Sequence, residues 1–152
     1  MGRAPFNVLV LPFFRAGDSI VYCAFERSDM HIWQFIAGGG ESGEIPLLAA
    51  KREAREEAGL PEHLNHFELQ AKTHVPSFCF SAEAQAAWGD TFVIPVHCFA
   101  VESPSREIIL SDEHTGFRWG SYEEIYDMLH YDVDHTALWE LSRRLQTQSL
   151  SC

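Results

Sequence analysis

A glycine-rich turn followed by a glutamate-bearing helix, at residues 38–60, constrains the fold of this chain more than any other segment. The turn holds three consecutive glycines from Gly38, which free the backbone from the usual φ limits and remove side-chain bulk where another group must approach closely. Pro46 then stands where a first helical turn tolerates proline, and residues 47–58 are almost wholly strong helix formers. Gly59 provides a helix stop. The segment therefore predicts a loop, a helix and a second turn.

The segments around this helix favour strands. Residues 6–14 and 19–27 are apolar runs joined by a tight turn, which is typical of a β-hairpin. Further strands are expected at residues 32–36, 67–75, 91–102 and 116–120. Residues 81–90, between two of these strands, are expected to form a loop. The order of strands, helix and strands predicts an α/β fold with a mixed sheet.

Two helices are expected at the C-terminal end. Ser121 and Glu124 have the spacing of a capping box, which opens the first of them. Asp134 is interpreted as the cap of the second, in which Leu138, Leu141 and Leu145 recur at helical spacing. Helices are therefore expected on the faces of the sheet.

Length and charge limit the classes of function. The 152 residues fit a single domain over positions 1–152. The net charge of -11 argues against a nucleic-acid partner, and no apolar run is long enough for a membrane helix. The four cysteines have no metal-ligand spacing and are interpreted as reduced thiols in a cytoplasmic protein. A monomer or homodimer acting on a small phosphorylated substrate is compatible with these features if metal ions screen the site.

The helix at residues 47–58 carries three glutamates on one face. Glu53, Glu56 and Glu57 are spaced i, i+3 and i+4, so their carboxylates share an arc of the helix and repel one another. A divalent cation such as Mg²⁺ would relieve the repulsion, because it takes oxygen ligands from a few carboxylates and from substrate phosphates. Taken alone, the pattern is more typical of a solvated helix face, with Arg52 pairing with Glu56.

The whole segment resembles the box that defines the Nudix family. That pattern is Gly, five residues, Glu, seven residues, Arg-Glu, an aliphatic, any residue, Glu-Glu, any residue, Gly and an aliphatic. The positions in register are Gly38, Glu44, Arg52, Glu53, Glu56, Glu57, Gly59 and Leu60. Ala54 fills a slot that is commonly a larger aliphatic, and Ala37 stands where many members have proline. The resemblance extends over about residues 6–145.

The resemblance implies an α/β/α sandwich around a mixed sheet, and a site that binds one to three divalent cations. Mg²⁺ is expected, with Mn²⁺ as a substitute. The metal ligands would be Glu53, Glu56, Glu57 and the backbone carbonyl of Gly38. Arg52 and Glu44 would support the loop and the carboxylates.

The implied reaction is attack of a metal-activated water on phosphorus. The family often takes its general base from a loop beyond the central strands, and Glu113 is similar in position. We therefore expect Glu113 to act as the base or as an added metal ligand. Its neighbour Asp112 is a competing candidate, and Glu53 is the fallback base.

The aromatic residues leave substrate specificity open. Trp33, Phe35, Phe80 and Trp88 are candidates to stack on a base or pterin ring, but such residues also serve as core fillers. The sequence is most similar to the dihydroneopterin triphosphate and dATP pyrophosphohydrolase branch, which predicts a triphosphate substrate and release of pyrophosphate. ADP-ribose or nucleotide-sugar cleavage is the alternative within the hydrolases. A Nudix domain that binds a nucleotide without hydrolysing it is the alternative of another class.

Overall fold

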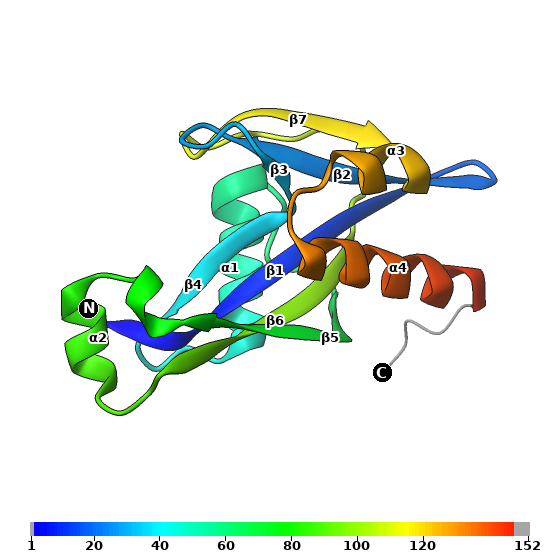
Figure 1. Cartoon of the computed structure of the whole chain (residues 1–152). Coiled ribbons are helices and arrows are strands. Elements are labelled where there is room, and N and C mark those ends of the chain that lie inside the picture. The colour runs from blue at the N-terminus through cyan, green and yellow to red at the C-terminus, as the bar shows by residue number, and fades with distance from the viewer. Residues whose placement is uncertain (1, 148–152) are drawn as a thin grey trace.

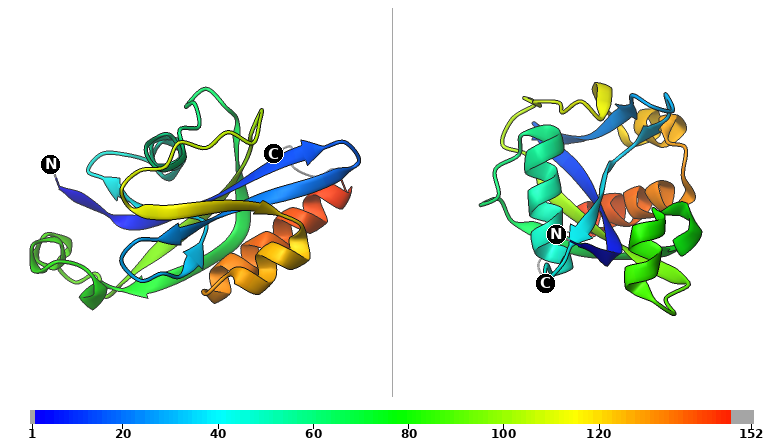
Figure 2. Two further views of the ribbon diagram at one scale, coloured as in Figure 1. Left: turned by 90° about the horizontal axis from the view of Figure 1, so that it is seen from above. Right: turned by 90° about the vertical axis from the view of Figure 1, so that its left-hand side faces the viewer.

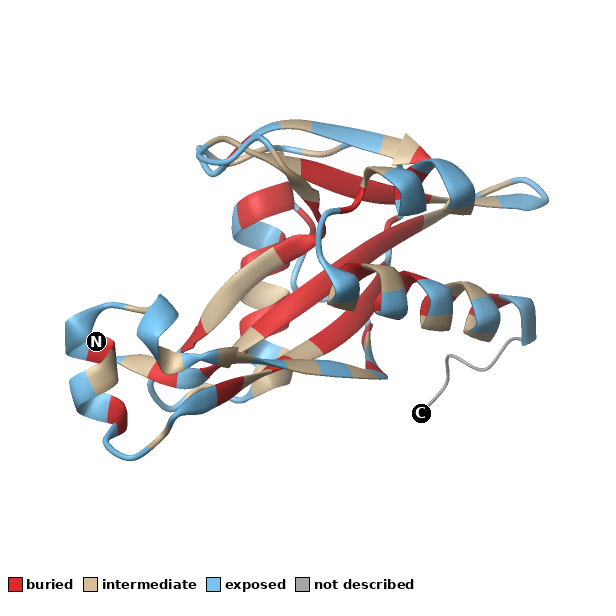
Figure 3. Cartoon of the chain, in the orientation of Figure 1, coloured by how far each residue is buried: buried red, intermediate tan, exposed pale blue. Residues whose placement is uncertain are grey.

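Strand β1 (Arg3–Ala16) forms the centre of the sheet and is buried along most of its length (Figure 3). The computed structural model describes residues 2–147. Along one edge, β1 pairs antiparallel with β4 (Ile36–Glu41) and, further on, with β2 (Ser19–Arg27). Along the other edge it pairs parallel with β6 (Val93–Glu102). The first two strands form the predicted hairpin, and the sheet is mixed, as expected (Figure 1).

The remaining strands extend the sheet outward. β3 (Trp33–Gln34) and β7 (His114–Gly120) both pair antiparallel with β2. On the opposite side, β5 (His66–Pro76) pairs antiparallel with β6. All strands predicted from the sequence are therefore present; β2 has the predicted ends and the others are shifted.

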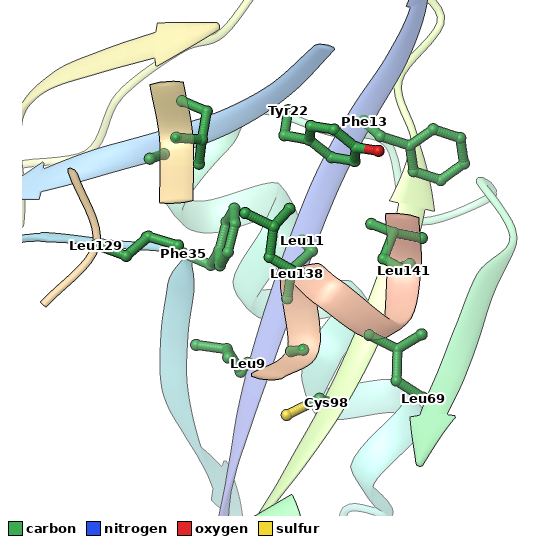
Figure 4. Close-up of a cluster of buried hydrophobic side chains, with 14 of the residues drawn as sticks. Leu9, Leu11, Phe13, Tyr22, Phe35, Leu69, Cys98, Leu129, Leu138 and Leu141 are labelled. Atoms are coloured by element: carbon green, nitrogen blue, oxygen red, sulfur yellow. The ribbon is translucent and has the colours of Figure 1, made fainter. Parts of the chain in front are cut away.

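Helices cover both faces of the sheet (Figure 2). On one face, α1 (Pro46–Ala58) packs on a core that includes Val8, Val10, Phe25 and Ile36. On the other, α3 (Tyr122–Met128) and α4 (Asp132–Thr147) pack on a core drawn in Figure 4, which includes Leu9, Leu11, Phe13, Leu138 and Leu141. The alternation of β1 side chains between these cores explains the apolar run at residues 8–14. The structure confirms the expected α/β/α arrangement.

Helix α1 lies close to the sheet because its inner face consists of small residues. Ala49, Ala50 and Ala54 are fully buried there. The helix begins at Pro46 and is followed by Gly59 in the left-handed conformation, with φ of 73°. Both helix ends were predicted from the sequence. This close packing fixes the position of the glutamates on the same helix.

The three consecutive glycines form part of β4, so the prediction of a loop there was wrong. Gly38 and Gly39 pair with Val8 and Asn7 of β1. The glycines are required for space, because a Cβ at Gly38 would overlap the Glu53 carboxyl group and one at Gly39 would overlap the Arg3 guanidinium. The chain turns only at Gly43, where φ is 84°.

Two further predictions were wrong. The expected loop at 81–90 contains α2 (Ala82–Trp88), which follows a short 3₁₀ turn and is capped by the Ser81 side chain accepting from the Ala84 N–H. Asp134 does not cap α4, since the helix already begins at Asp132. The capping box of Ser121 and Glu124 is confirmed at the start of α3. No helix within residues 2–147 has the length and apolarity needed to cross a membrane.

Candidate active site

Arg52 connects the β4 strand to the acidic face of α1. Its guanidinium donates to both carboxylate oxygens of Glu44, each at 2.9 Å, and to the Gly39 carbonyl oxygen at 2.8 Å. It also donates to Glu53 at 3.0 Å and to Glu56 at 3.2 Å. These partners raise the pKa of Arg52, chiefly through the hydrogen bonds to Glu44, and the same contact lowers the pKa of Glu44. Arg52 therefore remains charged and holds the loop against the helix.

Glu57 is a buried carboxylate that lacks hydrogen bonds. It is 1% exposed, and neither of its carboxylate oxygens has a hydrogen-bond partner among the described residues. Burial raises its pKa strongly, and the neighbouring carboxyl groups of Glu53 and Glu113 raise it further. A buried acidic group without partners is costly, so its presence here indicates a ligand-binding role.

The three predicted metal ligands differ in exposure. The side chain of Glu53 is 10% exposed and lies against Gly38, whereas that of Glu56 is 45% exposed and pairs with Arg52. Within residues 2–147, no three His, Cys, Asp or Glu side chains form a group that holds a metal ion as it stands. The fixed part of the site is thus the buried pair Glu53 and Glu57, with Glu56 at its rim.

Of the buried pair, Glu57 lines a cavity of about 190 Å³ together with the predicted base Glu113. The residues that line it are Arg3, Asn7, Arg27, Gln34, Ala37, Gly38, Gly39, Glu57, Glu113 and His114. Burial raises the pKa of Glu113, and the carboxylates of Glu53 and Glu56 raise it further. Asp112 and Glu113 are both exposed, but Asp112 is not among the lining residues. The fold therefore brings Glu113, but not Asp112, to the cavity with Glu57.

His114 also lines this cavity and lies beside Glu57. Its Nε2 atom is 3.8 Å from a Glu57 carboxylate oxygen, and both side chains are almost fully buried. Burial lowers the pKa of His114, so the ring is neutral near pH 7 and does not neutralise Glu57. The sequence analysis did not assign His114 a role, although it directly follows Glu113.

A larger cavity of about 610 Å³ adjoins the first. The two share Asn7, Arg27, Gln34 and Ala37. The larger one is also lined by residues of β5, by Tyr131 just before α4, and by the first residues of α4, which include Asp134. Its size and apolar walls suit a flat heterocycle with its sugar. These lining residues were missed in the sequence because they come from distant segments with no shared motif.

The four aromatic candidates do not gather at one place. Phe35 has no exposed surface and belongs to the core under α4, so its assignment to substrate binding was wrong. Trp33 is partly buried and packs against the same core. Phe80 and Trp88 contact each other at 5.3 Å between ring centroids, beside the N-terminal end of β1. Neither lines the 610 Å³ cavity.

Asp134 predicts a pH dependence of stability. It is 1% exposed, and burial raises its pKa to about 7 from the usual 3.8, although the Phe35 N–H donates to it at 2.9 Å. Because the pKa of Asp134 is higher in the folded state than in the unfolded state, the free energy of unfolding falls as the pH rises from 3.8 to about 7. Asp134→Asn keeps an acceptor and removes the charge. We expect the variant to gain roughly 1–4 kcal/mol over wild type between about pH 4 and about pH 8, measured by urea unfolding. Parallel pH profiles for the two proteins would contradict this.

Comparison with known proteins identifies the family. The NUDIX domain family model matches residues 4–141. A crystal structure of a protein described as a NUDIX hydrolase from Listeria monocytogenes is similar, with 36% sequence identity, a TM-score of 0.87, and coverage of 98% of this chain and 99% of that one. No curated protein matches. These matches define a hydrolase of the Nudix class, an enzyme that acts on acid anhydrides. The chain belongs to the NUDIX domain family.

More distant structures share the fold. The Escherichia coli dihydroneopterin triphosphate pyrophosphohydrolase has 19% identity and a TM-score of 0.72, covering 93% of this chain and 98% of that one. The NUDIX domain of Shewanella oneidensis NrtR, solved with ADP-ribose, has 14% identity and a TM-score of 0.68. The match covers 92% of this chain and 87% of that one. These similarities concern the fold alone.

Proposed function

We propose that this protein is a magnesium-dependent hydrolase that cleaves a phosphoanhydride bond in a nucleoside or pterin triphosphate and releases pyrophosphate. The observation that carries the proposal is the buried, unpartnered carboxylate of Glu57, which opens into a cavity next to Glu53 and Glu113. A divalent cation satisfies such a group, because its charge offsets both the desolvation and the repulsion between carboxylates.

The residues fit a metal site of this kind. Glu53, Glu56, Glu57 and the Gly38 carbonyl would hold Mg²⁺, or Mn²⁺ in its place, with Glu113 as a further ligand or as the base. The space above Gly38 supports this, since only a glycine leaves room for the Glu53 carboxyl. When bound, the cation supplies positive charge for the phosphoryl oxygens and makes a coordinated water more acidic.

The remaining residues of the site have separate tasks in this proposal. Glu113 accepts the proton of the attacking water, and its raised pKa favours that role near neutral pH. Arg52 and Glu44 position Glu53 and the β4 backbone through their hydrogen bonds. Arg52 thus contributes to catalysis by positioning the ligands.

The adjoining 610 Å³ cavity supports a nucleoside or pterin at the end of the phosphate chain. It does not distinguish a triphosphate from ADP-ribose, the ligand in the NrtR structure, so a nucleoside diphosphate linked to a sugar is the second candidate. Three free cysteines among the described residues, Cys23, Cys79 and Cys98, support a reducing compartment such as the cytoplasm. We also propose that the protein acts as a monomer or homodimer and that it does not bind nucleic acid.

A substrate panel tests the proposal. Nucleoside triphosphates, dihydroneopterin triphosphate and ADP-ribose are incubated with the protein and Mg²⁺, Mn²⁺ or a chelator, and the products are separated. We expect pyrophosphate and a monophosphate from at least one triphosphate, and no turnover with chelator. Formation of AMP and ribose 5-phosphate as the best-supported products would replace the triphosphate proposal with the second candidate. Absence of turnover on every compound would contradict both.

A further inference from the structure

Three arginines lie at the site within residues 2–147, and Arg3 is the one that forms no ion pair there. Arg52 binds several glutamates, and Arg27 binds both carboxylate oxygens of Asp29, at 2.9 and 2.6 Å. Arg3, by contrast, has no carboxylate within 4.0 Å among residues 2–147. It lines the 190 Å³ cavity together with Glu57 and is partly buried. A partly buried guanidinium without a carboxylate in ion-pair contact is suited to an anionic ligand.

The Arg3 guanidinium is held in place mainly by neutral groups. One of its terminal nitrogens donates to the carbonyl oxygens of Ala4 and Phe6, at 3.1 and 3.2 Å, and the other donates to the Asn7 side chain at 2.7 Å. Arginine has five N–H donors, so these bonds leave donors for a ligand. Carbonyl and amide oxygens orient the guanidinium but do not neutralise it.

An aromatic pair covers the other side of Arg3. The guanidinium carbon lies 5.0 Å from the centroid of the Phe80 ring and 5.9 Å from that of Trp88. The Trp88 indole N–H also donates to the Arg3 carbonyl oxygen at 2.7 Å. Figure 1 shows α2, which carries Trp88, beside the start of β1. The α2 segment thus fixes both the backbone and the side chain of Arg3.

Arg3 and Glu57 line the same 190 Å³ cavity, although Arg3 and the neighbouring Glu53 approach β4 from opposite sides. Gly38 and Gly39 are adjacent in β4 and face opposite sides of it, so Glu53 lies against one side of the strand and Arg3 against the other. The 190 Å³ cavity includes residues from both sides. Burial lowers the pKa of Arg3, whereas the nearby Glu53 carboxylate raises it and the Arg52 charge lowers it.

We propose that Arg3 binds the phosphate chain of the substrate and that Phe80 and Trp88 are positioning residues that hold its guanidinium toward the carboxylates. The proposal rests on the proposed function and assigns a phosphate subsite to that same site. A guanidinium presents parallel N–H groups that match two phosphate oxygens, and its charge offsets the phosphate charge that the metal ions leave.

Binding of inorganic pyrophosphate with Mg²⁺, measured by titration calorimetry, tests the subsite without requiring turnover. We expect Arg3→Gln to weaken pyrophosphate binding by about 10- to 100-fold, the effect of losing a charge-assisted contact, and Arg3→Lys to retain part of it. Arg15→Gln is the matched control, because Arg15 is exposed at the far end of β1 and pairs with Glu102. We expect this control to bind like wild type.

The positioning role predicts a coupled effect. Phe80→Leu removes the aromatic face while keeping an apolar side chain, and we expect KM for the best panel substrate to rise several-fold with kcat nearly unchanged. In an Arg3→Gln background the same change should have no further effect, because the group that it positions is absent. A structural role for Phe80 would instead give additive losses.

The outcomes separate this inference from the proposed function. Wild-type turnover in the panel together with unchanged pyrophosphate binding by Arg3→Gln would overturn the phosphate subsite alone, as would a wild-type protein that binds no pyrophosphate. Absence of turnover in the panel with weakened binding by Arg3→Gln would contradict the proposed hydrolysis and leave the subsite supported. Thermal unfolding checks each variant, and Arg3→Lys and Phe80→Leu supply the test if Arg3→Gln does not fold.

Discussion

Replacement of Glu57 by Gln is expected to abolish hydrolysis while the fold remains intact. Glu57 is the most buried of the proposed metal ligands, and no described group neutralises it. Loss of its charge would weaken metal binding and remove several kcal/mol of transition-state stabilisation, so we expect kcat to fall by about 10³-fold or more. Glu56→Gln should also abolish turnover. Steady-state kinetics at saturating Mg²⁺ measure both effects.

The same variant should not lose stability in the absence of metal. Burial and the neighbouring carboxyl groups of Glu53 and Glu113 raise the pKa of Glu57, which favours its neutral form without metal, so a neutral amide of similar size adds no charge or bulk to the site. The melting temperature with chelator should therefore hold or rise. Glu62→Gln is the control, because Glu62 lies beyond the helix and pairs with Arg55 outside the site. A collapse of the melting temperature in both Glu56→Gln and Glu57→Gln would mean that these carboxylates are structural.

Much of the fold was predictable because its determinants are local. The hairpin of β1 and β2, the ends of α1 and the capping box at Ser121 each depend on residues close together in the sequence. The acidic helix face follows from the same local spacing. The sequence therefore indicated which helix carries the site.

The errors concern features that depend on distant contacts. The glycines of β4 read as a loop, but Gly39 is required by the Arg3 side chain and Gly40 by the Phe6 ring, both from another strand. Asp134 reads as a helix cap, yet it accepts a hydrogen bond from the backbone of Phe35, far away in the sequence. Such roles become visible only once the sheet has brought these segments together.

The role of Arg3 could not be predicted from the sequence, because it also depends on distant contacts. Nothing in the first residues of the chain distinguishes Arg3 from Arg15, which lies near the other end of the same strand. The difference arises because β4 places Gly39 beside Arg3 and α2 places an aromatic pair over it. Arg15 instead faces Glu102 at the surface. Charge alone therefore did not predict the phosphate subsite.

Glu113→Gln is expected to lower kcat by roughly 10²-fold with a smaller change in KM, because a general base acts in the transition state more than in substrate binding. Glu113 lines the cavity with Glu57, and burial followed by the Glu53 and Glu56 charges raises its pKa toward the range where a carboxylate accepts protons efficiently. Gln preserves the shape of the side chain and removes its basicity.

The neighbouring Asp112 provides the discriminating variant. It does not line the cavity, so Asp112→Asn should keep a near-normal kcat. Metal affinity, measured by Mn²⁺ titration of both variants, separates the two roles proposed for Glu113, because a lost ligand weakens binding whereas a lost base leaves it unchanged. A near-normal kcat in Glu113→Gln would transfer the role to Glu53, or to Asp112 if Asp112→Asn is the variant that loses activity.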